Sequence, residues 1–232
     1  MTVRSLRRYP VKAMGGEALE SAEVDARGLV GDRWFAVVDP DGHLASGKNT
    51  RRMRRHDGVF QYAAATTADG VVVTGTSGRW AVGSAALDAE LTAALGLPSR
   101  VLPEASVPHF DDGAVSLVGT ATLAWCAQRW GIDADPRRLR ANLVIETDEP
   151  FVEESWVGST VTAGGVELRV VQRVERCRTI NLAQDGVAGT TRWLKALGAE
   201  RQLRVAVYAD VVLPGAVRVG DDVVVGAGVT VG

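Results

Sequence analysis

The feature that most constrains this chain is the spacing of its apolar residues, which fall into many short runs ending at Gly, Asp or Asn. Runs of this length between turn-forming residues are typical of β-strands joined by tight turns. Strands are predicted over Thr2–Arg8, Arg33–Asp39, Gly58–Thr66, Val71–Thr74, Ala141–Glu146, Val166–Arg176 and Leu203–Leu213. Near the end of the chain, Val217–Val219 and Val223–Val225 flank Gly220-Asp221-Asp222, a pattern that predicts a terminal hairpin.

Three other segments have the periodicity and the end signals of helices. Each is preceded by Ser or Thr, whose hydroxyl can cap a helix N-terminus, and each is followed by Gly, which commonly ends a helix. They are Ala85–Leu95, Ala121–Trp130 and Thr191–Leu197. Many short strands with few helices predict a mainly β, barrel-like protein with a few packed helices. We expect a boundary after the first helix, which divides the chain into residues 1–96 and 97–232.

The composition excludes several classes of protein. The net charge of −2 at pH 7 argues against a general nucleic-acid binder. No apolar run reaches the roughly 18 residues of a membrane-spanning helix, and the N-terminus lacks the apolar segment of a secretory signal. The two cysteines, Cys126 and Cys177, cannot form a disulfide framework, so we expect a cytoplasmic protein with reduced thiols.

The sequence lacks the motifs of most familiar enzyme classes. It has no C-x-x-C pair and no H-E-x-x-H, and its three histidines are far apart in the chain, so a zinc site is hard to assemble. A G-x-x-x-x-G-K-[ST] phosphate loop, a G-x-G-x-x-G turn after a strand and a G-x-S-x-G elbow are also missing. The remaining candidates for chemistry are one cysteine and a set of cationic residues.

The candidate cysteine is Cys177, which lies at the end of a predicted strand between Arg176 and Arg178. Positive neighbours favour the thiolate over the thiol. A thiolate is a soft ligand, suited to a soft metal or to carrying sulfur, whereas the alternative is a half-buried cysteine at a strand end. For Cys126, on the apolar face of a predicted helix, a core position is the better interpretation.

The cationic candidates are Lys12, Arg33 and Arg140. Lys12 follows Tyr9-Pro10-Val11, where proline fixes the backbone that carries the amine. Arg33 follows Gly31-Asp32, and Arg140 stands two residues before Asn142. An Arg side chain binds phosphate through paired N–H groups, and Asn offers both donors and an acceptor. Around one thiolate these residues would form a pocket for an anionic ligand, although a solvated surface is the alternative for each of them.

The densest cluster of positive charge is Arg51-Arg52-Met53-Arg54-Arg55-His56. It could bind nucleic acid or an acidic partner. No aromatic residue is interleaved with these arginines, and the whole chain is not basic. The pattern therefore favours a solvated loop or the rim of an anion pocket over a nucleic-acid site.

Six stretches, in order along almost the whole chain, carry a resemblance to a known family. They are Tyr9-Pro10-Val11-Lys12, Gly28-Leu29-Val30-Gly31-Asp32-Arg33-Trp34, Arg138-Leu139-Arg140-Ala141-Asn142-Leu143-Val144, the block from Pro150-Phe151 to Glu153-Glu154-Ser155-Trp156, Arg176-Cys177 and Val219-Gly220-Asp221-Asp222-Val223. In these stretches the sequence resembles the molybdenum-cofactor sulfurase C-terminal (MOSC) domain family. It is most similar to the two-part subgroup that includes the mitochondrial amidoxime reducing component and its bacterial relatives.

The resemblance implies a β-barrel-like MOSC fold with an intertwined N-terminal β-rich region. It also implies a molybdenum ion bound to one pyranopterin dithiolene, with Cys177 as metal ligand and catalytic residue. The cofactor would be bound by Lys12, Arg33, Thr120, Thr122, Arg140, Asn142 and Arg176. The implied reaction is the reduction of N-hydroxylated compounds such as amidoximes, hydroxamic acids and N-hydroxylated bases.

The resemblance also sets expectations for partners. The chain has no ferredoxin-type cysteines, so we expect its electrons to come from a separate ferredoxin-like protein, cytochrome or flavoprotein, with no nucleic-acid or membrane partner. Four positions depart from the family pattern: Ala13 replaces a serine, Ala141 replaces a proline, Glu175 replaces a small polar residue, and Lys48 is near the position of an arginine. The alternative function is a sulfur carrier or cofactor-delivery module that uses a Cys177 persulfide or thiolate.

Overall fold

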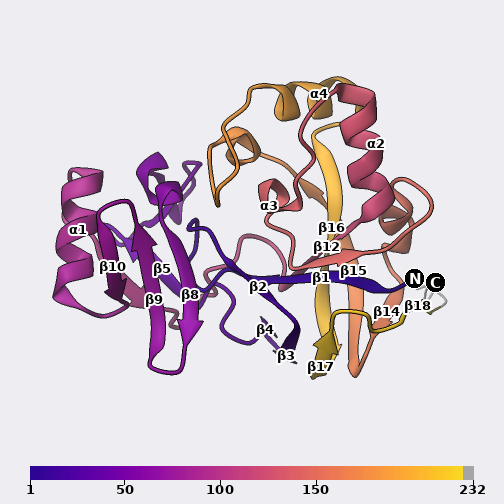
Figure 1. The fold of residues 1–232 in the computed structure, drawn as a ribbon, viewed down its shortest axis with the longest axis horizontal. Coiled ribbons are helices and arrows are strands. Elements are labelled where there is room, and N and C mark those ends of the chain that lie inside the picture. The colour runs from indigo at the N-terminus through magenta and orange to yellow at the C-terminus, as the bar shows by residue number, and fades with distance from the viewer. Residues whose placement is uncertain (227–232) are drawn as a thin grey trace.

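The computed structural model describes residues 1–226 and has a large and a small lobe (Figure 1). The mainly β architecture with a few helices agrees with the sequence prediction, which is confirmed. The small lobe contains much of the first half of the chain, and the large lobe contains the second half together with the first strands. Within residues 1–226, no helix combines the length and the apolar composition needed to cross a membrane.

The large lobe is built on one sheet, which among the described residues has eight strands in the order β18-β14-β15-β16-β12-β13-β1-β2. Their bounds are β1 Val3–Arg8, β2 Glu17–Leu19, β12 Val115–Gly119, β13 Leu143–Ile145, β14 Thr160–Ala163, β15 Val166–Glu175, β16 Arg204–Leu213 and β18 Val223–Val225. Thr2, just before β1, bridges to Asp222, just before β18. This bridge brings β1 and β18 together, so the sheet closes into a barrel.

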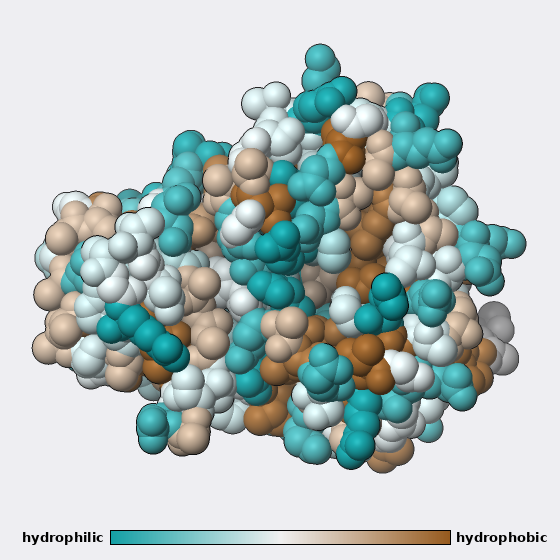
Figure 2. Space-filling model, in the orientation of Figure 1, coloured by the Kyte–Doolittle hydropathy of each residue, from teal (hydrophilic) through white to brown (hydrophobic). Residues whose placement is uncertain are grey.

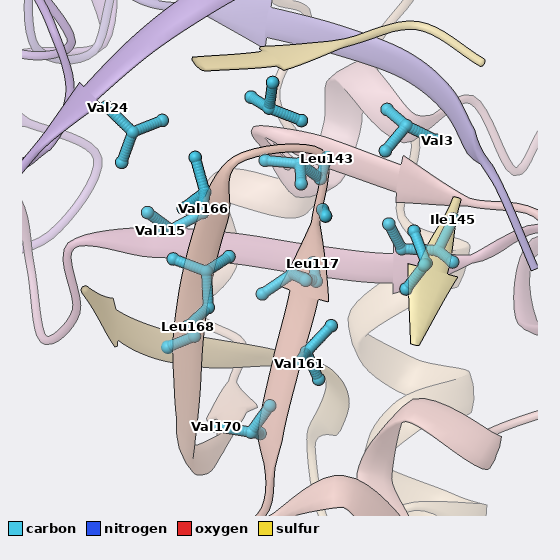
Figure 3. Close-up of a cluster of buried hydrophobic side chains, with 14 of the residues drawn as sticks. Val3, Val24, Val115, Leu117, Leu143, Ile145, Val161, Val166, Leu168 and Val170 are labelled. Carbon is cyan, nitrogen blue, oxygen red and sulfur yellow. The ribbon is translucent and has the colours of Figure 1, made fainter. Parts of the chain in front are cut away.

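The barrel encloses the main hydrophobic core. Leu117, Val161, Val166 and Leu168 come from three strands and point toward one another (Figure 3). Each of these side chains is 1% exposed or less. On β15, Val166, Leu168 and Val170 are buried while the residues between them are not, because successive side chains of a strand point to opposite faces.

The small lobe has a core of its own between two sheets and a helix. One sheet contains β8 Ala63–Thr67, β9 Gly70–Gly75 and β10 Gly78–Ala81, and the other contains β5 Phe35–Val38, β6 Leu44–Ser46, β7 Met53–Arg55 and β11 Arg100–Pro103. Helix α1 (Ala85–Leu95) begins where the Ser84 side chain accepts a hydrogen bond from the Leu87 N–H, and it ends at Gly96 in the left-handed conformation. Leu87 and Leu91 anchor the helix in this core.

The chain passes between the lobes more than once. After β1 and β2, the strands β3 (Ser21–Asp25) and β4 (Gly28–Leu29) pair with β17 (Gly215–Arg218), which comes from the far end of the sequence. The chain then builds the small lobe, whose last strand is β11, and returns to the barrel at β12. Both lobes therefore contain residues from the first hundred of the chain, and the division into 1–96 and 97–232 stays a prediction.

The remaining helices cover the large lobe outside the barrel (Figure 1). They are α2 Thr120–Trp130, α3 Pro136–Leu139, α4 Arg192–Glu200, η2 Val152–Trp156 and η3 Arg178–Asn181, whereas η1 Asp57–Gln61 belongs to the small lobe. Trp193 and Leu197 of α4 pack with Cys126 of α2, and all three are fully buried. The predicted core position of Cys126 is thereby confirmed.

Two sequence predictions were wrong in detail. The terminal hairpin does not form, because β17 pairs with β3 and β18 pairs with β14. The expected turn residues are present, but closure of the barrel brings Asp221 next to Val3. The Val3 N–H donates to the Asp221 carbonyl at 2.9 Å, and β17 and β18 diverge from this point. The strand expected from Gly58 begins only at Ala63, since the preceding residues form η1.

Truncation of the barrel core should unfold the protein more easily than truncation of its surface. We expect Leu168→Ala to lower the free energy of unfolding by about 2–5 kcal/mol, because the side chain is 1% exposed and its removal leaves a cavity. Leu213→Ala, on the neighbouring strand but 51% exposed, is the matched control and should change stability by less than about 0.5 kcal/mol. Urea denaturation measures both values, and equal losses would contradict the assignment of the core.

Candidate functional site

A polar cleft lies at the junction of the two lobes. Of the residues predicted for the site, six line it: Lys12, Arg33, Arg140, Asn142, Arg176 and Cys177. It contains about 850 Å³ of empty space, counting the part that opens to solvent at its mouth. Hydrophilic residues gather along this junction on the face shown in Figure 2.

Three residues of the cleft wall hold an unusual backbone conformation. Ala13, Arg33 and Arg140 have φ values of 68°, 54° and 52°, in the left-handed region that favours glycine. For a non-glycine residue this conformation costs about 1–2 kcal/mol. Arg140 reaches it as the residue that ends α3, whose start is capped by Asp135. Such strain is concentrated at functional sites, where surrounding contacts fix the backbone.

Arg140 presents a buried guanidinium group to the cleft wall. It lies over the ring of Tyr9, with Cζ 4.2 Å from the ring centroid, and Arg33 lies near the same ring at 5.0 Å. Neither Nη1 nor Nη2 of Arg140 has a hydrogen-bond partner within residues 1–226. Burial, reinforced by the charge of Arg33, lowers the pKa of Arg140 to about 10, so the side chain stays charged at neutral pH.

Arg176 is the second guanidinium group without an acidic partner. Its Nε donates to the Val205 carbonyl at 3.0 Å and its Nη1 to the Leu139 carbonyl at 2.9 Å. The described part of the chain offers no partner to its Nη2, and burial lowers its pKa. Arg33, in contrast, pairs with Asp32 and donates to the Arg140 carbonyl at 3.1 Å. The positive charges of Arg140 and Arg176 are therefore the uncompensated ones in this wall.

Cys177 stands between β15 and η3 and is half-buried. Its Sγ donates to the Thr179 Oγ1 at 3.2 Å. The neighbouring Arg178 turns away from the cleft and pairs with Asp57 at 2.6 Å, while also donating to the Gly47 carbonyl at 3.1 Å. These contacts attach the loop that carries the thiol to the small lobe.

Lys12 and Lys48 lie in the small-lobe wall and share one carboxylate. Lys12 Nζ donates to Asp111 Oδ1 at 2.5 Å and to the His109 carbonyl at 2.7 Å, and Lys48 Nζ lies 3.1 Å from Asp111 Oδ2. Burial lowers the pKa of Lys12. Although burial alone would raise it, the pKa of Asp111 lies well below its usual range because both ammonium groups stabilise the carboxylate. Asp111 is not among the predicted site residues, because an acidic pair before a glycine, as in Asp111-Asp112-Gly113, is usually a solvated turn.

Asn142 supports the cleft wall, because its side chain already forms hydrogen bonds with Ser116 and Arg7. Its Oδ1 accepts from the Ser116 N–H at 3.1 Å and from Ser116 Oγ at 3.0 Å, and its Nδ2 donates to the Arg7 carbonyl at 3.2 Å. The residue is 2% exposed. It therefore joins β1, β12 and β13 beneath the cleft.

Two predicted site residues, Thr120 and Thr122, are not among the residues that line the cleft. Thr120 Oγ1 donates to the Thr147 carbonyl at 3.3 Å. Thr122 is fully buried, and its Oγ1 donates to Glu153 Oε2 at 2.9 Å. Both hydroxyls attach the start of α2 to the segment after β13, so they donate their hydrogen bonds there and not into the cleft.

The arrangement suits an anionic ligand that also contains a soft metal. Two buried guanidinium groups without a carboxylate favour an anion, because an unpaired buried charge costs several kcal/mol and a bound anion removes that cost. The thiol of Cys177 lies on the same cleft and is a soft ligand when deprotonated. The residues present therefore fit a phosphorylated metal cofactor.

Comparison with known families agrees with this chemistry. A family model of the MOSC domain matches residues 104–224, and a model of the MOSC N-terminal beta barrel domain matches residues 1–89. The chain therefore belongs to the MOSC family. With both matches it has the two-part architecture of that family.

Similar proteins are distant in sequence. Over 69 residues the chain is 36% identical to a protein named molybdenum cofactor sulfurase from Danio rerio, a match that covers 30% of this chain and only 8% of that relative. The crystal structure of the YuaD protein from Bacillus subtilis covers 96% of this chain and 93% of its own, with a TM-score of 0.51 and 13% identity, which shows the fold alone. The crystal structure of YiiM from Geobacillus stearothermophilus is 17% identical and matches 50% of this chain and 55% of the YiiM chain, with a TM-score of 0.37.

The ring of Tyr9, and not its hydroxyl, should be what the site requires. The hydroxyl oxygen is buried and has no hydrogen-bond partner in the described residues, so Tyr9→Phe should leave the free energy of unfolding unchanged or raise it by about 1 kcal/mol. Tyr9→Leu removes the ring beneath Arg140 and should lower that free energy by about 2–4 kcal/mol. Urea denaturation distinguishes the two, and a Phe variant that loses more than about 1 kcal/mol would contradict this assignment.

The ion pair between Arg178 and Asp57 should make stability depend on pH in the acid range. The hydrogen bond that Arg178 donates to Asp57 lowers the pKa of this carboxyl from 3.8 to about 2. The ion pair therefore stabilises the folded protein above pH 4, and this stabilisation is lost as the pH falls toward 2. Asp57→Asn should therefore be less stable than the parent at pH 7, by less than about 1 kcal/mol because both side chains are partly exposed. Urea denaturation at several pH values should show the difference vanishing near pH 2, whereas a constant difference would argue against the pair.

Proposed function

We propose that this protein is a molybdenum-cofactor-binding oxidoreductase that reduces N-hydroxylated substrates such as amidoximes, hydroxamic acids and N-hydroxylated bases. The observation that carries the proposal is the half-buried thiol of Cys177 on the same cleft as the uncompensated guanidinium groups of Arg140 and Arg176. Membership of the MOSC family supports a function related to the molybdenum cofactor.

In this proposal the chain's residues divide the work of holding the cofactor. Arg140 and Arg176 bind its anionic part, with Arg33 and Lys12 completing the positive wall, and Cys177 is the protein ligand to molybdenum. Asn142 fixes the backbone beneath them through Ser116. Thr120 and Thr122 are left out, since their hydroxyls are engaged elsewhere.

When bound, the cofactor supplies the two-electron redox chemistry, and the chain supplies position and charge. The reaction takes an N–OH group, two electrons and two protons to an N–H group and one water molecule. Lys12, held by Asp111, keeps a proton at Nζ in the cleft wall. The electrons come from a separate one-electron carrier protein.

The test is to produce the protein in a host that makes molybdenum cofactor and to measure bound molybdenum together with benzamidoxime reduction by reduced methyl viologen. The parent should contain molybdenum and turn over, and Cys177→Ser should lower activity by at least about 100-fold while keeping its stability. The matched control is Cys126→Ala, which changes the other cysteine in the core away from the cleft. A metal-free parent without turnover would refute the proposal.

A second candidate function is a sulfur carrier or a module that delivers the cofactor, with Cys177 as the persulfide-bearing residue. The local match to a protein named molybdenum cofactor sulfurase favours it. After incubation with a cysteine desulfurase, mass spectrometry should then find one added sulfur atom on Cys177 and none on Cys126. An unmodified Cys177 in protein that holds redox-active molybdenum would exclude this second function.

A further inference from the structure

A group of exposed arginines lies beside the cleft and takes no part in the proposed chemistry. These are Arg51, Arg54 and Arg55, which we call the arginine rim. We propose that the arginine rim is the docking surface for an acidic one-electron-carrier protein, which rests on the proposed reductase function and names the kind of partner that serves it.

Two rim residues, Arg54 and Arg55, belong to a strand that pairs with a strand of the cleft wall. Strand β7 (Met53–Arg55) pairs in parallel with β6 (Leu44–Ser46), with Ser46 opposite Arg55. Ser46 itself lines the cleft, and Lys48, two residues later, lines it too. Arg54 and Arg55 therefore lie one strand away from the cleft wall on the small-lobe side.

The rim is also connected to the loop of the thiol. Arg55 lies 3.1 Å from Asp57, and the same carboxylate pairs with Arg178 at 2.6 Å. Arg178 is the residue next to Cys177. A protein that contacts Arg55 is therefore connected through the Asp57 carboxylate to Arg178, which follows the proposed metal ligand Cys177. This connection is a short route for electron transfer.

The charges of the rim are available to a partner. The side chains of Arg54 and Arg55 are 48% and 52% exposed, and Arg51 makes no ion pair with any residue in the range 1–226. Arg54 Nη2 lies 3.2 Å from His43 Nδ1 and 3.8 Å from Asp41, so no close carboxylate neutralises it. Positive side chains that are exposed and weakly paired attract an acidic surface and raise its association rate.

The neighbouring Arg52 has a different task and is not part of the rim. Its Nη2 donates to the Pro108 carbonyl at 2.5 Å, so it fixes the loop before Asp111. That loop also exposes Val107, which is 52% exposed and precedes the Pro108 that Arg52 contacts. A small apolar contact beside exposed charges is the composition expected of a transient docking surface.

An acidic protein fits the rim better than a nucleic acid does. The segment from Lys48 to Asp57 has no Phe, Tyr or Trp on which a base could stack, and the whole chain has a net charge of −2. A basic patch beside a redox cleft suits a globular carrier that must approach the cofactor closely and leave again.

The test uses the double variant Arg51→Glu/Arg54→Glu, with Arg100→Glu/Arg129→Glu as the control. The control makes the same change in net charge at arginines that are 72% and 59% exposed and do not line the cleft. The probes are an acidic flavodoxin and an acidic [2Fe–2S] ferredoxin. Binding of the oxidised probes to the protein is measured by biolayer interferometry between 20 and about 300 mM salt.

The proposal expects at least one probe to bind the parent and the control, more weakly at high salt, and to lose at least about tenfold in affinity in the rim variant. With the reduced probe as electron donor, kcat/KM for the donor should fall by a similar factor, while activity with methyl viologen stays unchanged in both variants. The proposal would be overturned if neither probe binds the parent, or if the control loses as much affinity as the rim variant. It would also be overturned if the protein binds an RNA or DNA oligonucleotide in place of the probes. Loss of methyl viologen activity in the parent would instead refute the reductase function, which the binding measurement does not require.

Discussion

The site depends on positive charge that the fold buries without neutralising. Arg140 lies over the ring of Tyr9, and Arg33 and Arg7 lie near the same ring, so three guanidinium groups share one aromatic side chain. Asp32, the carboxylate that pairs with Arg33, also accepts a hydrogen bond from the Tyr9 N–H. Since burial of unpaired charge is unfavourable, the rest of the structure has to supply the stability that this wall lacks, and the closed barrel with its aliphatic core is the source.

The path of the chain explains why the cleft is where it is. The first strand is built into the barrel, the chain leaves to form the small lobe, and it returns at β12. Lys12 lies just after the first strand, whereas Cys177 follows β15. The two walls are therefore brought together by the crossing of the chain between lobes, and ion pairs such as Arg178 with Asp57 hold them at a fixed separation.

The sequence indicated most of the strands and all three longer helices, because apolar periodicity is local. Some end signals were wrong: Thr120 is the first residue of α2 and not its cap, and Gly198 lies inside α4. It also singled out the cations of the cleft. It could not show that Thr120 and Thr122 face away from the cleft, because Thr147 and Glu153, which engage their hydroxyls, are about thirty residues away in the chain. The separation of β17 from β18 was equally hidden, since it follows from the closure of the barrel through Thr2 and Asp222.

At Arg140, the left-handed backbone costs stability that a glycine would not lose. Glycine at this position would adopt the φ value without strain, and it would also remove a positive charge that has no acidic partner in the described residues. A directed-evolution experiment that rewards heat resistance alone should therefore drift toward glycine at position 140 and arrive at a sturdier, inert protein. Only a screen that also rewards ligand retention would keep this arginine.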